Sequence, residues 1–242
     1  MSAPHVIWIS GASSGIGAAL AESVPFPGAR RFGISRRPPV VGEHVAADLA
    51  QPAVWPVIAA HFDAVLAEHR PGEALFLHMS GMGTPAGPVT DAALDAYTDA
   101  VLLNSAAGQV LGKAFLTACR RTGTRATLVL CSSPAAAKTL PGVSHYGAGK
   151  AALQFWAAAV ATEVEDWARV FSVIPFAVDT PMVRETIAHP DATPIAAHLR
   201  AAADRGELAS AEGTAEQIWQ LVLDGTHGDA VPVGAVPAGV AR

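Results

Sequence analysis

Charge, aromatic rings and cysteines are scarce in this sequence of 242 residues. Only 15% of the residues are charged, and the formal net charge of −5 comes without any block of Lys or Arg. This balance argues against a nucleic acid or an anionic membrane surface as partner. No apolar run reaches the roughly 18 residues that a membrane-spanning helix needs. Two cysteines, Cys119 and Cys131, are too few for a disulfide framework, and no histidines stand at metal-ligand spacing, so we expect buried thiols and no metal.

The amino-terminal residues lead almost at once into a predicted strand, with neither a basic segment nor an export cleavage site. We therefore expect a cytoplasmic protein. Hydrophobic residues make up 51% of the chain, which is enough to bury a large core within one domain spanning residues 1–242.

Short apolar runs alternate with longer alanine-rich segments of helical period. This alternation is typical of a parallel sheet covered by helices on both faces, because each crossover between parallel strands needs a helix. The sequence predicts a doubly wound α/β fold of the Rossmann type, with three αβα layers and six to seven strands. Strands are expected near residues 5–10, 30–35, 43–47, 74–79, 126–132 and 169–174. A seventh run near 230–233 contains Pro232, which removes a ladder hydrogen bond, so its place in the sheet is left open.

A glycine-rich turn, Ser10–Gly17, joins the first predicted strand to the helix that follows. Such a turn can cradle a pyrophosphate, since backbone N–H groups point at the ligand from the helix N-terminus. Three residues separate its first two glycines, whereas the common fingerprint has one, and a flexible turn between core elements is the alternative. The residues expected to contact a dinucleotide here are Gly11, Ser13, Ser14, Gly15, Ile16 and Gly17.

Two adjacent arginines, Arg36 and Arg37, follow the second predicted strand, where a cofactor lacking the 2′-phosphate would favour an acidic residue. Guanidinium groups bind phosphate in fork geometry, so the pair favours NADPH over NADH, with solvated loop arginines as the alternative. Asp48 and Leu49 follow the third strand. Asp48 could accept from the adenine amino group or cap a turn.

Tyr146 and Lys150 are four residues apart in a predicted helix and therefore lie on one face of it. A phenol has an ordinary pKa of roughly 10 and needs help to exchange a proton near neutral pH. An ammonium group beside the phenol would stabilise the phenolate and lower that pKa. The spacing predicts a proton donor beside a fixed cation, although such pairs also arise by chance.

Together the two motifs resemble the short-chain dehydrogenase/reductase family over essentially the whole chain. The resemblance implies that Ser133 orients a substrate carbonyl and that Tyr146 supplies the proton. It implies that Lys150 lowers the Tyr146 pKa and holds the nicotinamide ribose, while Asn104 kinks its helix and anchors a water chain to the lysine. The remaining cofactor contacts that it implies are Tyr146, Lys150, Ser80, Gly81, Pro175, Val178 and Thr180.

Three segments depart from the family pattern. His78–Gly81 stands where the family has Asn-Asn-Ala-Gly, so Gly81 still lets the cofactor pass closely while the asparagine hydrogen bonds are lost. Pro175 is followed by Phe176 instead of glycine, which could reshape the pocket near the nicotinamide. The last strand is short and lacks the usual Gly-Gly ending.

Three short stretches, 80–88, 150–155 and 178–182, resemble the benzil and sepiapterin reductase branch of the family, which implies α-dicarbonyl substrates. The segment 180–211 holds few large apolar residues and is expected to form a mobile helical lid. The apolar helix that begins near Tyr146 exceeds what one sheet can cover, so we expect a homodimer or homotetramer, as the resemblance also implies. His145 is expected to line the substrate pocket or to be half exposed, with a proton relay as the alternative.

The leading hypothesis is an NADPH-dependent carbonyl reductase. The same residues could act in reverse as an NADP-dependent alcohol dehydrogenase, although the arginine pair argues against this because the NADP pool of cells is largely reduced. A non-catalytic dinucleotide-sensing protein is the third hypothesis. Such proteins usually lack the tyrosine or the lysine, and the altered segment 78–81 is the main feature in its favour.

Overall fold

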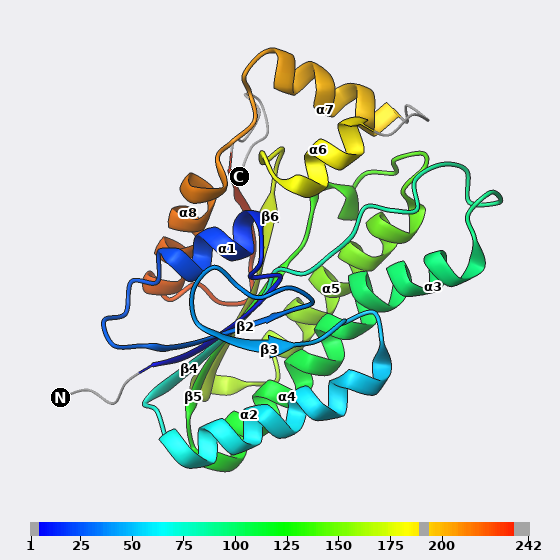
Figure 1. The fold of residues 1–242 in the computed structure, drawn as a ribbon. Helices are drawn as coiled ribbons and strands as arrows, with labels where there is room; N and C mark the ends of the chain where they lie inside the picture. The colour runs from blue at the N-terminus through cyan, green and yellow to red at the C-terminus, as the bar shows by residue number, and fades with distance from the viewer. Residues whose placement is uncertain (1–4, 189–193, 235–242) are drawn as a thin grey trace.

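The computed structural model describes residues 5–188 and 194–234. Seven parallel strands form one sheet in the order β3-β2-β1-β4-β5-β6-β7, which is the doubly wound arrangement that the sequence predicts (Figure 1). The strands are β1 (Val6–Ser10), β2 (Arg30–Ser35), β3 (Glu43–Ala46), β4 (Glu73–His78), β5 (Arg125–Cys131), β6 (Ala168–Pro175) and β7 (Ala230–Val233). The order reverses between β1 and β4, so the ends of these two strands open the crevice in which such sheets bind ligands.

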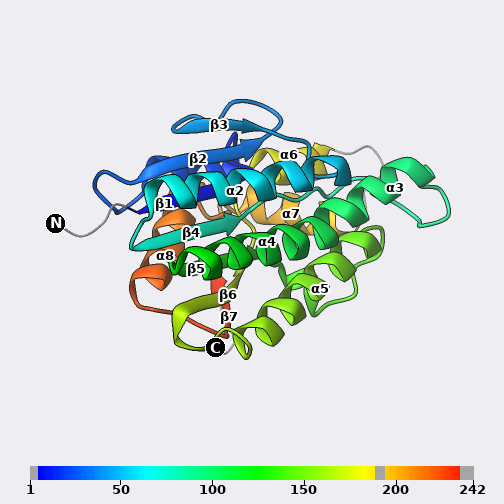
Figure 2. The ribbon, with the colours of Figure 1, turned by 90° about the horizontal axis from the view of Figure 1, so that it is seen from below.

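Helices cover both faces of the sheet, giving three layers (Figure 2). The helices are α1 (Gly15–Glu22), α2 (Trp55–His69), α3 (Leu94–Val101), α4 (Ala107–Thr122), α5 (Ser144–Ala161), α6 (Pro181–Ala188), α7 (Pro194–Asp204) and α8 (Ala211–Leu223). On one face α2, α4 and α5 pack on the sheet, and on the other face α1 and α8 do so. Among the described residues no helix is both long and apolar enough to cross a membrane.

Aromatic rings fill the centre of the core beneath α2 and α4. The indole of Trp8, in β1, meets the ring of Phe62 edge-on with 5.1 Å between centroids and lies 6.0 Å from that of Phe115. All three side chains are fully buried. This packing holds β1 rigidly, and with it the loop that leaves its C-terminal end.

Each predicted strand boundary lies within one residue of the observed one. The strand that contained Pro232 also forms, as β7 at the edge of the sheet, with Pro232 opposite Ile174 of β6. An edge strand pairs on one side only, so a proline whose missing N–H faces outward leaves the ladder intact.

The segment expected to be a lid contains α6 and α7, which pack on each other above the C-terminal edge of the sheet (Figure 1). Ala196 and Ala202 are its buried side chains within these two helices. A β-bridge between Val178 and Ala209 closes the base of the segment. The segment is therefore helical as expected, its mobility stays a prediction, and residues 189–193 of it lie outside the described residues.

Candidate active site

The glycine turn has the tight geometry that a phosphate cradle requires. A Cβ atom at Gly17 would lie 2.4 Å from the carbonyl oxygen of Gly11, so only glycine fits there. Gly15 has a φ of 56°, and a Cβ atom on it would lie 3.0 Å from Thr180 Cγ2. Ser14 is the extended N-cap of α1 and its side chain makes no capping hydrogen bond. The first turn of α1 therefore presents N–H groups without a side-chain cap, which suits an anion such as a pyrophosphate.

The altered segment at the end of β4 is held by hydrogen bonds from β1. The hydroxyl of Ser10 accepts from the backbone N–H of Ser80 at 3.1 Å and lies 3.1 Å from Nδ1 of His78. His78 is fully buried, and burial, with a smaller effect from the charge of Lys150, lowers its pKa to about 3. Because the imidazole is neutral, its Nδ1 can accept the hydroxyl hydrogen of Ser10. The Ser10–His78–Ser80 contacts thus fix the backbone that leads to Gly81. The family pattern has asparagine at the first two positions of this segment.

The two arginines expected to bind a 2′-phosphate follow β2 at the same edge of the sheet as the glycine turn. Ser10 pairs with Ile34, two residues before Arg36, and both arginine side chains are exposed. The backbone carbonyl of Arg37 accepts from Ser35 Oγ at 2.6 Å, which orders this turn. Their position is compatible with a cofactor laid across the crevice.

The residues after β3 are less free to bind adenine. Asp48 Oδ1 accepts from the backbone N–H of Ala50 at 3.1 Å, which is the turn-capping role named as the alternative. Leu49 is buried, and its carbonyl accepts from Trp55 Nε1 at 3.0 Å. Adenine contacts from these residues remain a prediction.

The side chain of Lys150 lies between the ends of β4 and β5. Its side chain is only 2% exposed, and Nζ donates to the carbonyl oxygen of Cys131 at 2.8 Å. A Cβ atom on Gly81 would lie 3.1 Å from the same nitrogen. Nζ also lies 5.6 Å from the centroid of the Tyr146 ring, so the predicted pairing of these side chains is confirmed. Burial lowers the pKa of the lysine.

Ser133 lies near the hydroxyl of Tyr146, where it acts to lower the pKa of the phenol. Its Oγ also accepts from the N–H of Ala135 at 3.2 Å, so the serine both caps a short helical turn and faces the phenol. Burial is the largest influence on the phenol and raises the pKa of Tyr146, the neighbouring thiol of Cys131 raises it further, and Ser133 opposes this. The net shift of the pKa is therefore upward, opposite to the lowering expected for a phenol beside an ammonium group, because loss of hydration dominates. A lowering effect of Lys150 itself stays a prediction.

Asn104 lies in a π-helical turn, Leu102–Ala106, that joins α3 to α4. Its side chain is fully buried, where Oδ1 accepts from the N–H of Met82 at 2.9 Å and Nδ2 donates to the carbonyl of Met82 at 2.8 Å. The expected irregularity of this helix is present, as a π turn. Its side chain clamps the loop after β4, and a water chain to Lys150 remains a prediction.

The residues after β6 close the site from the opposite side. Val178 is 2% exposed and pairs with Ala209, and Thr180 packs its methyl group against the glycine turn. Thr180 Oγ1 also accepts from the N–H of Val183 at 3.4 Å at the start of α6. Phe176, half-buried, donates its backbone N–H to the carbonyl of Val233 at 3.1 Å. The structure thus places Thr180 beside the cradle, and its contact with a nicotinamide stays a prediction.

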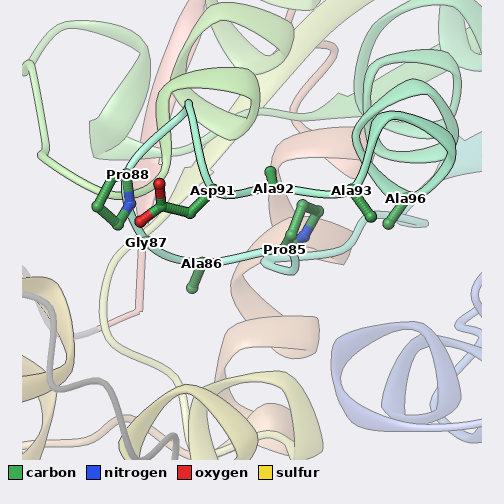
Figure 3. A pocket seen from close by; sticks show the side chains of 8 residues that line it. All are labelled: Pro85, Ala86, Gly87, Pro88, Asp91, Ala92, Ala93 and Ala96. Carbon is green, nitrogen blue, oxygen red and sulfur yellow. The ribbon is translucent and has the colours of Figure 1, made fainter.

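His145 is buried and not half exposed. It is only 4% exposed, and its Nε2 donates to the carbonyl oxygen of Pro85 at 2.7 Å. A place in the wall of the substrate pocket, or in a proton relay, stays a prediction. No sequence pattern marks this contact, because its acceptor is a backbone atom in a distant loop. Beside this loop lies a cavity of about 450 Å³ (Figure 3), lined by Pro85, Ala86, Gly87, Pro88, Asp91, Ala92, Ala93 and Ala96.

Both cysteines are buried free thiols, as expected. Across residues 5–188 and 194–234, no group of three or more His, Cys, Asp or Glu side chains could hold a metal ion.

Comparison with known sequences gives one family. The sequence profile described as short chain dehydrogenase matches residues 5–191. No curated protein sequence matches this chain significantly.

Solved structures with low sequence identity share the fold. A short-chain dehydrogenase/reductase from Saccharomyces cerevisiae is 20% identical, covers 94% of this chain and 95% of its own, and superposes with a TM-score of 0.80. The ligand-free aldohexose dehydrogenase of Thermoplasma acidophilum is 19% identical over 99% and 98%, with a TM-score of 0.80. A variant of actinorhodin polyketide ketoreductase, solved with NADPH, is 21% identical over 97% and 98%, with a TM-score of 0.79.

Proposed function

This chain belongs to the short-chain dehydrogenase/reductase family, and from that premise we propose that it is an NADPH-dependent carbonyl reductase. Family membership makes it an NAD(P)-dependent oxidoreductase. The single observation that carries the finer proposal is the proximity of Ser133 to the Tyr146 hydroxyl with Lys150 fixed beside them, at the sheet edge that also holds the glycine cradle. Two hydroxyl groups and one ammonium group meet there, from Ser133 after β5 and from Tyr146 and Lys150 of α5.

The geometry supports the following division of labour. Bound NADPH supplies the hydride that adds to the carbonyl carbon of the substrate. The hydroxyls of Ser133 and Tyr146 bind the carbonyl oxygen, and the Tyr146 proton moves to that oxygen as it gains negative charge. Lys150, whose ammonium is held by the Cys131 carbonyl, stabilises the phenolate that remains. The alcohol is the product, and Tyr146 regains its proton from solvent.

The reductive direction is favoured by the cofactor preference and not by the state of the phenol. Burial raises the pKa of Tyr146, which keeps the hydroxyl protonated at neutral pH but also makes it a weaker proton donor, so the phenol does not distinguish reduction from oxidation. Arg36 and Arg37, exposed beside the cradle, support NADPH as the reductant, which a largely reduced cytoplasmic NADP pool would supply.

A dinucleotide-sensing protein has less support than the sequence alone suggested. The feature in its favour was the altered segment after β4, and the Ser10–His78–Ser80 contacts hold that segment in place. The proton donor and its lysine are also both present. For the substrate we propose ketones or α-dicarbonyl compounds, on the likeness of residues 80–88, 150–155 and 178–182 to the benzil and sepiapterin reductase branch.

We also propose that the chain forms a homodimer or homotetramer through α4 and α5. Phe155, on the outer face of α5, is 79% exposed, and Val110 on α4 is 41% exposed. Large apolar side chains on adjacent helices favour burial against another subunit.

The experiment is NADPH consumption by the purified protein across α-diketones, quinones, ketosteroids and β-keto esters, with NADH in parallel. Diketone turnover that prefers NADPH is the expected result. Oxidation of secondary alcohols with NADP⁺ but no carbonyl reduction would assign the dehydrogenase direction. Cofactor binding without turnover of any carbonyl or alcohol would favour the sensor.

A further inference from the structure

The connection from β4 to α3, residues 79–93, runs along one side of the catalytic residues. At its start, a Cβ atom on Gly81 would lie 3.1 Å from Lys150 Nζ. Two residues later, a Cβ atom on Gly83 would lie 3.6 Å from Thr186 Oγ1 and 4.0 Å from Met182 Cγ, both in α6. The loop therefore spans from the catalytic lysine to the helix above the site, and it forms a wall between them.

Besides the bond from Ser80 to Ser10, three hydrogen-bonded attachments within the described residues hold this wall to the rest of the protein. The side chain of Asn104 hydrogen-bonds to both the N–H and the carbonyl of Met82. His145 donates to the carbonyl of Pro85. The N–H of Gly87 donates to the carbonyl of Gly142 at 2.9 Å. Farther along, the N–H of Asp91 bonds within the loop, to Pro88. The His145 attachment is the middle one and the one made by a side chain of the catalytic helix α5.

The ring of His145 is fixed in one orientation. It is buried against Tyr97 of α3, edge-on, with 5.3 Å between centroids and an interplanar angle of 87°. A carbonyl oxygen can only accept, so Nε2 carries the proton and Nδ1 is left as an acceptor. Nδ1 is buried and has no hydrogen-bond partner among the described residues. Burying an unpaired acceptor is unfavourable, so any stabilisation of the loop by this histidine comes from the hydrogen bond of its Nε2–H group.

We propose that His145 is a positioning residue that determines substrate specificity by holding residues 82–88 in place beside the adjacent proton donor, Tyr146. The effect of His145 on substrates rests on the proposed reductase activity, whereas its effect on the position of the loop does not. The start of the loop lies between Lys150 and α6, so a displaced loop changes the space for a substituent beside the catalytic residues. The same displacement would reshape the cavity of Figure 3, which is lined by loop residues and by Ala96 of α3. KM for a small carbonyl compound, which contacts only the catalytic groups, depends less on the position of this wall than KM for a bulky one.

The kinetic test compares His145→Leu, which removes the donor and keeps an apolar volume, with His145→Gln, which keeps an N–H donor at a similar reach. Benzil and diacetyl serve as bulky and small diketones, with NADPH saturating. In His145→Leu we expect KM for benzil to rise about tenfold relative to KM for diacetyl, the size of one lost buried hydrogen bond. His145→Gln should restore most of the difference. An equal fall in kcat for both substrates in both variants would overturn the proposal and indicate a proton relay.

The second test needs no activity. Backbone amide hydrogen exchange is followed by mass spectrometry in peptides covering residues 82–93, with peptides of α2 as an internal control. His145→Leu should exchange about tenfold faster in the loop alone, and His145→Gln close to the wild-type rate. Unchanged exchange in the loop would overturn the positioning role, even if kinetics changed. If the wild-type protein reduces neither diketone, the proposed function fails while this exchange measurement still decides the role of His145 in holding the loop.

Discussion

The ammonium nitrogen of Lys150 lies 2.8 Å from the carbonyl oxygen of Cys131 and donates a hydrogen bond to it. That carbonyl ends β5, two residues before Ser133. The strand that leads to Ser133 therefore also orients the ammonium group of Lys150. Since Tyr146 lies one turn before Lys150 on α5, all three groups are placed by the packing of one helix against one strand.

Replacing Tyr146 with Phe should lower kcat by about 10²–10⁴-fold, because it removes the hydroxyl that we propose as the proton donor. NADPH binding should change less than about twofold, as the ring remains in place. Steady-state kinetics and fluorescence titration of NADPH measure the two effects. Tyr97→Phe is the matched control, since Tyr97 is the other tyrosine of the chain and its hydroxyl makes a long contact, 3.4 Å, with Ser144. Comparable losses in both variants would argue against Tyr146 as the donor.

Removing both arginines, as Arg36→Ala with Arg37→Ala, should raise KM for NADPH by about 10–100-fold, since a charged hydrogen-bonded contact to the 2′-phosphate is lost. KM for NADH should change less than about threefold. The control is Arg205→Ala, an exposed arginine that pairs with Glu207. Equal weakening of both cofactors would mean that the arginines do not recognise the 2′-phosphate.

The sheet and the catalytic helix could be predicted from the sequence because their signals are local. Apolar runs of four to eight residues mark the strands, and the spacing of Tyr146 and Lys150 follows from the helical repeat. Ser133 could be singled out only through the family resemblance, because a serine at the end of a strand is by itself more often a helix cap.

Other features depend on contacts between distant residues. The raised pKa of Tyr146 results from how deeply the finished fold buries it, and the bond from His145 to Pro85 joins segments 60 residues apart. Pro232 is tolerated only because strand order places β7 at the edge. The irregular helix at Asn104 is expected only from the family resemblance. Its stretch, Leu-Leu-Asn-Ser, contains no glycine or proline that would indicate a π turn.

His78 should make the protein less stable in acid. Its folded-state pKa of about 3 lies below the ordinary value of 6.5, so the unfolded chain binds a proton that the folded chain excludes. The contribution is fully present above pH 6.5 and is lost as the pH falls toward 3. At about pH 5 the loss amounts to roughly 2 kcal/mol.

Urea unfolding at about pH 7 and about pH 5 tests this in wild type and His78→Asn, whose amide does not titrate. The variant should be less sensitive to acid by roughly the same 2 kcal/mol. His198→Asn, at an exposed position in α7, should follow the wild type. Parallel pH dependence in wild type and His78→Asn would show that His78 is not the titrating group.

Phe155→Glu should shift the protein toward monomers if α5 packs against another subunit, because a carboxylate is costly to bury there. Sedimentation velocity measures the assembly state at several concentrations. Leu223→Glu changes an apolar side chain of α8, 54% exposed, on the other side of the sheet and serves as control. An unchanged oligomer in Phe155→Glu would exclude this face.

The π turn also constrains how the chain can change in length. A π turn holds one residue more than an α-helical turn, and each helical residue turns the chain by about 100°. Deleting one residue within this turn would therefore restore a regular α-helical turn and leave α4 in register, whereas a deletion within α4 would rotate the following residues by about 100°. Such a rotation would carry α4 away from partners that it now meets without a side chain. A Cβ atom on Gly108 would lie 3.0 Å from His78 Cδ2, and one on Gly112 would lie 2.8 Å from Trp156 Cη2. The chain can thus lose a residue at the π turn more easily than farther along α4, although that loss would remove the wider turn in which Asn104 lies.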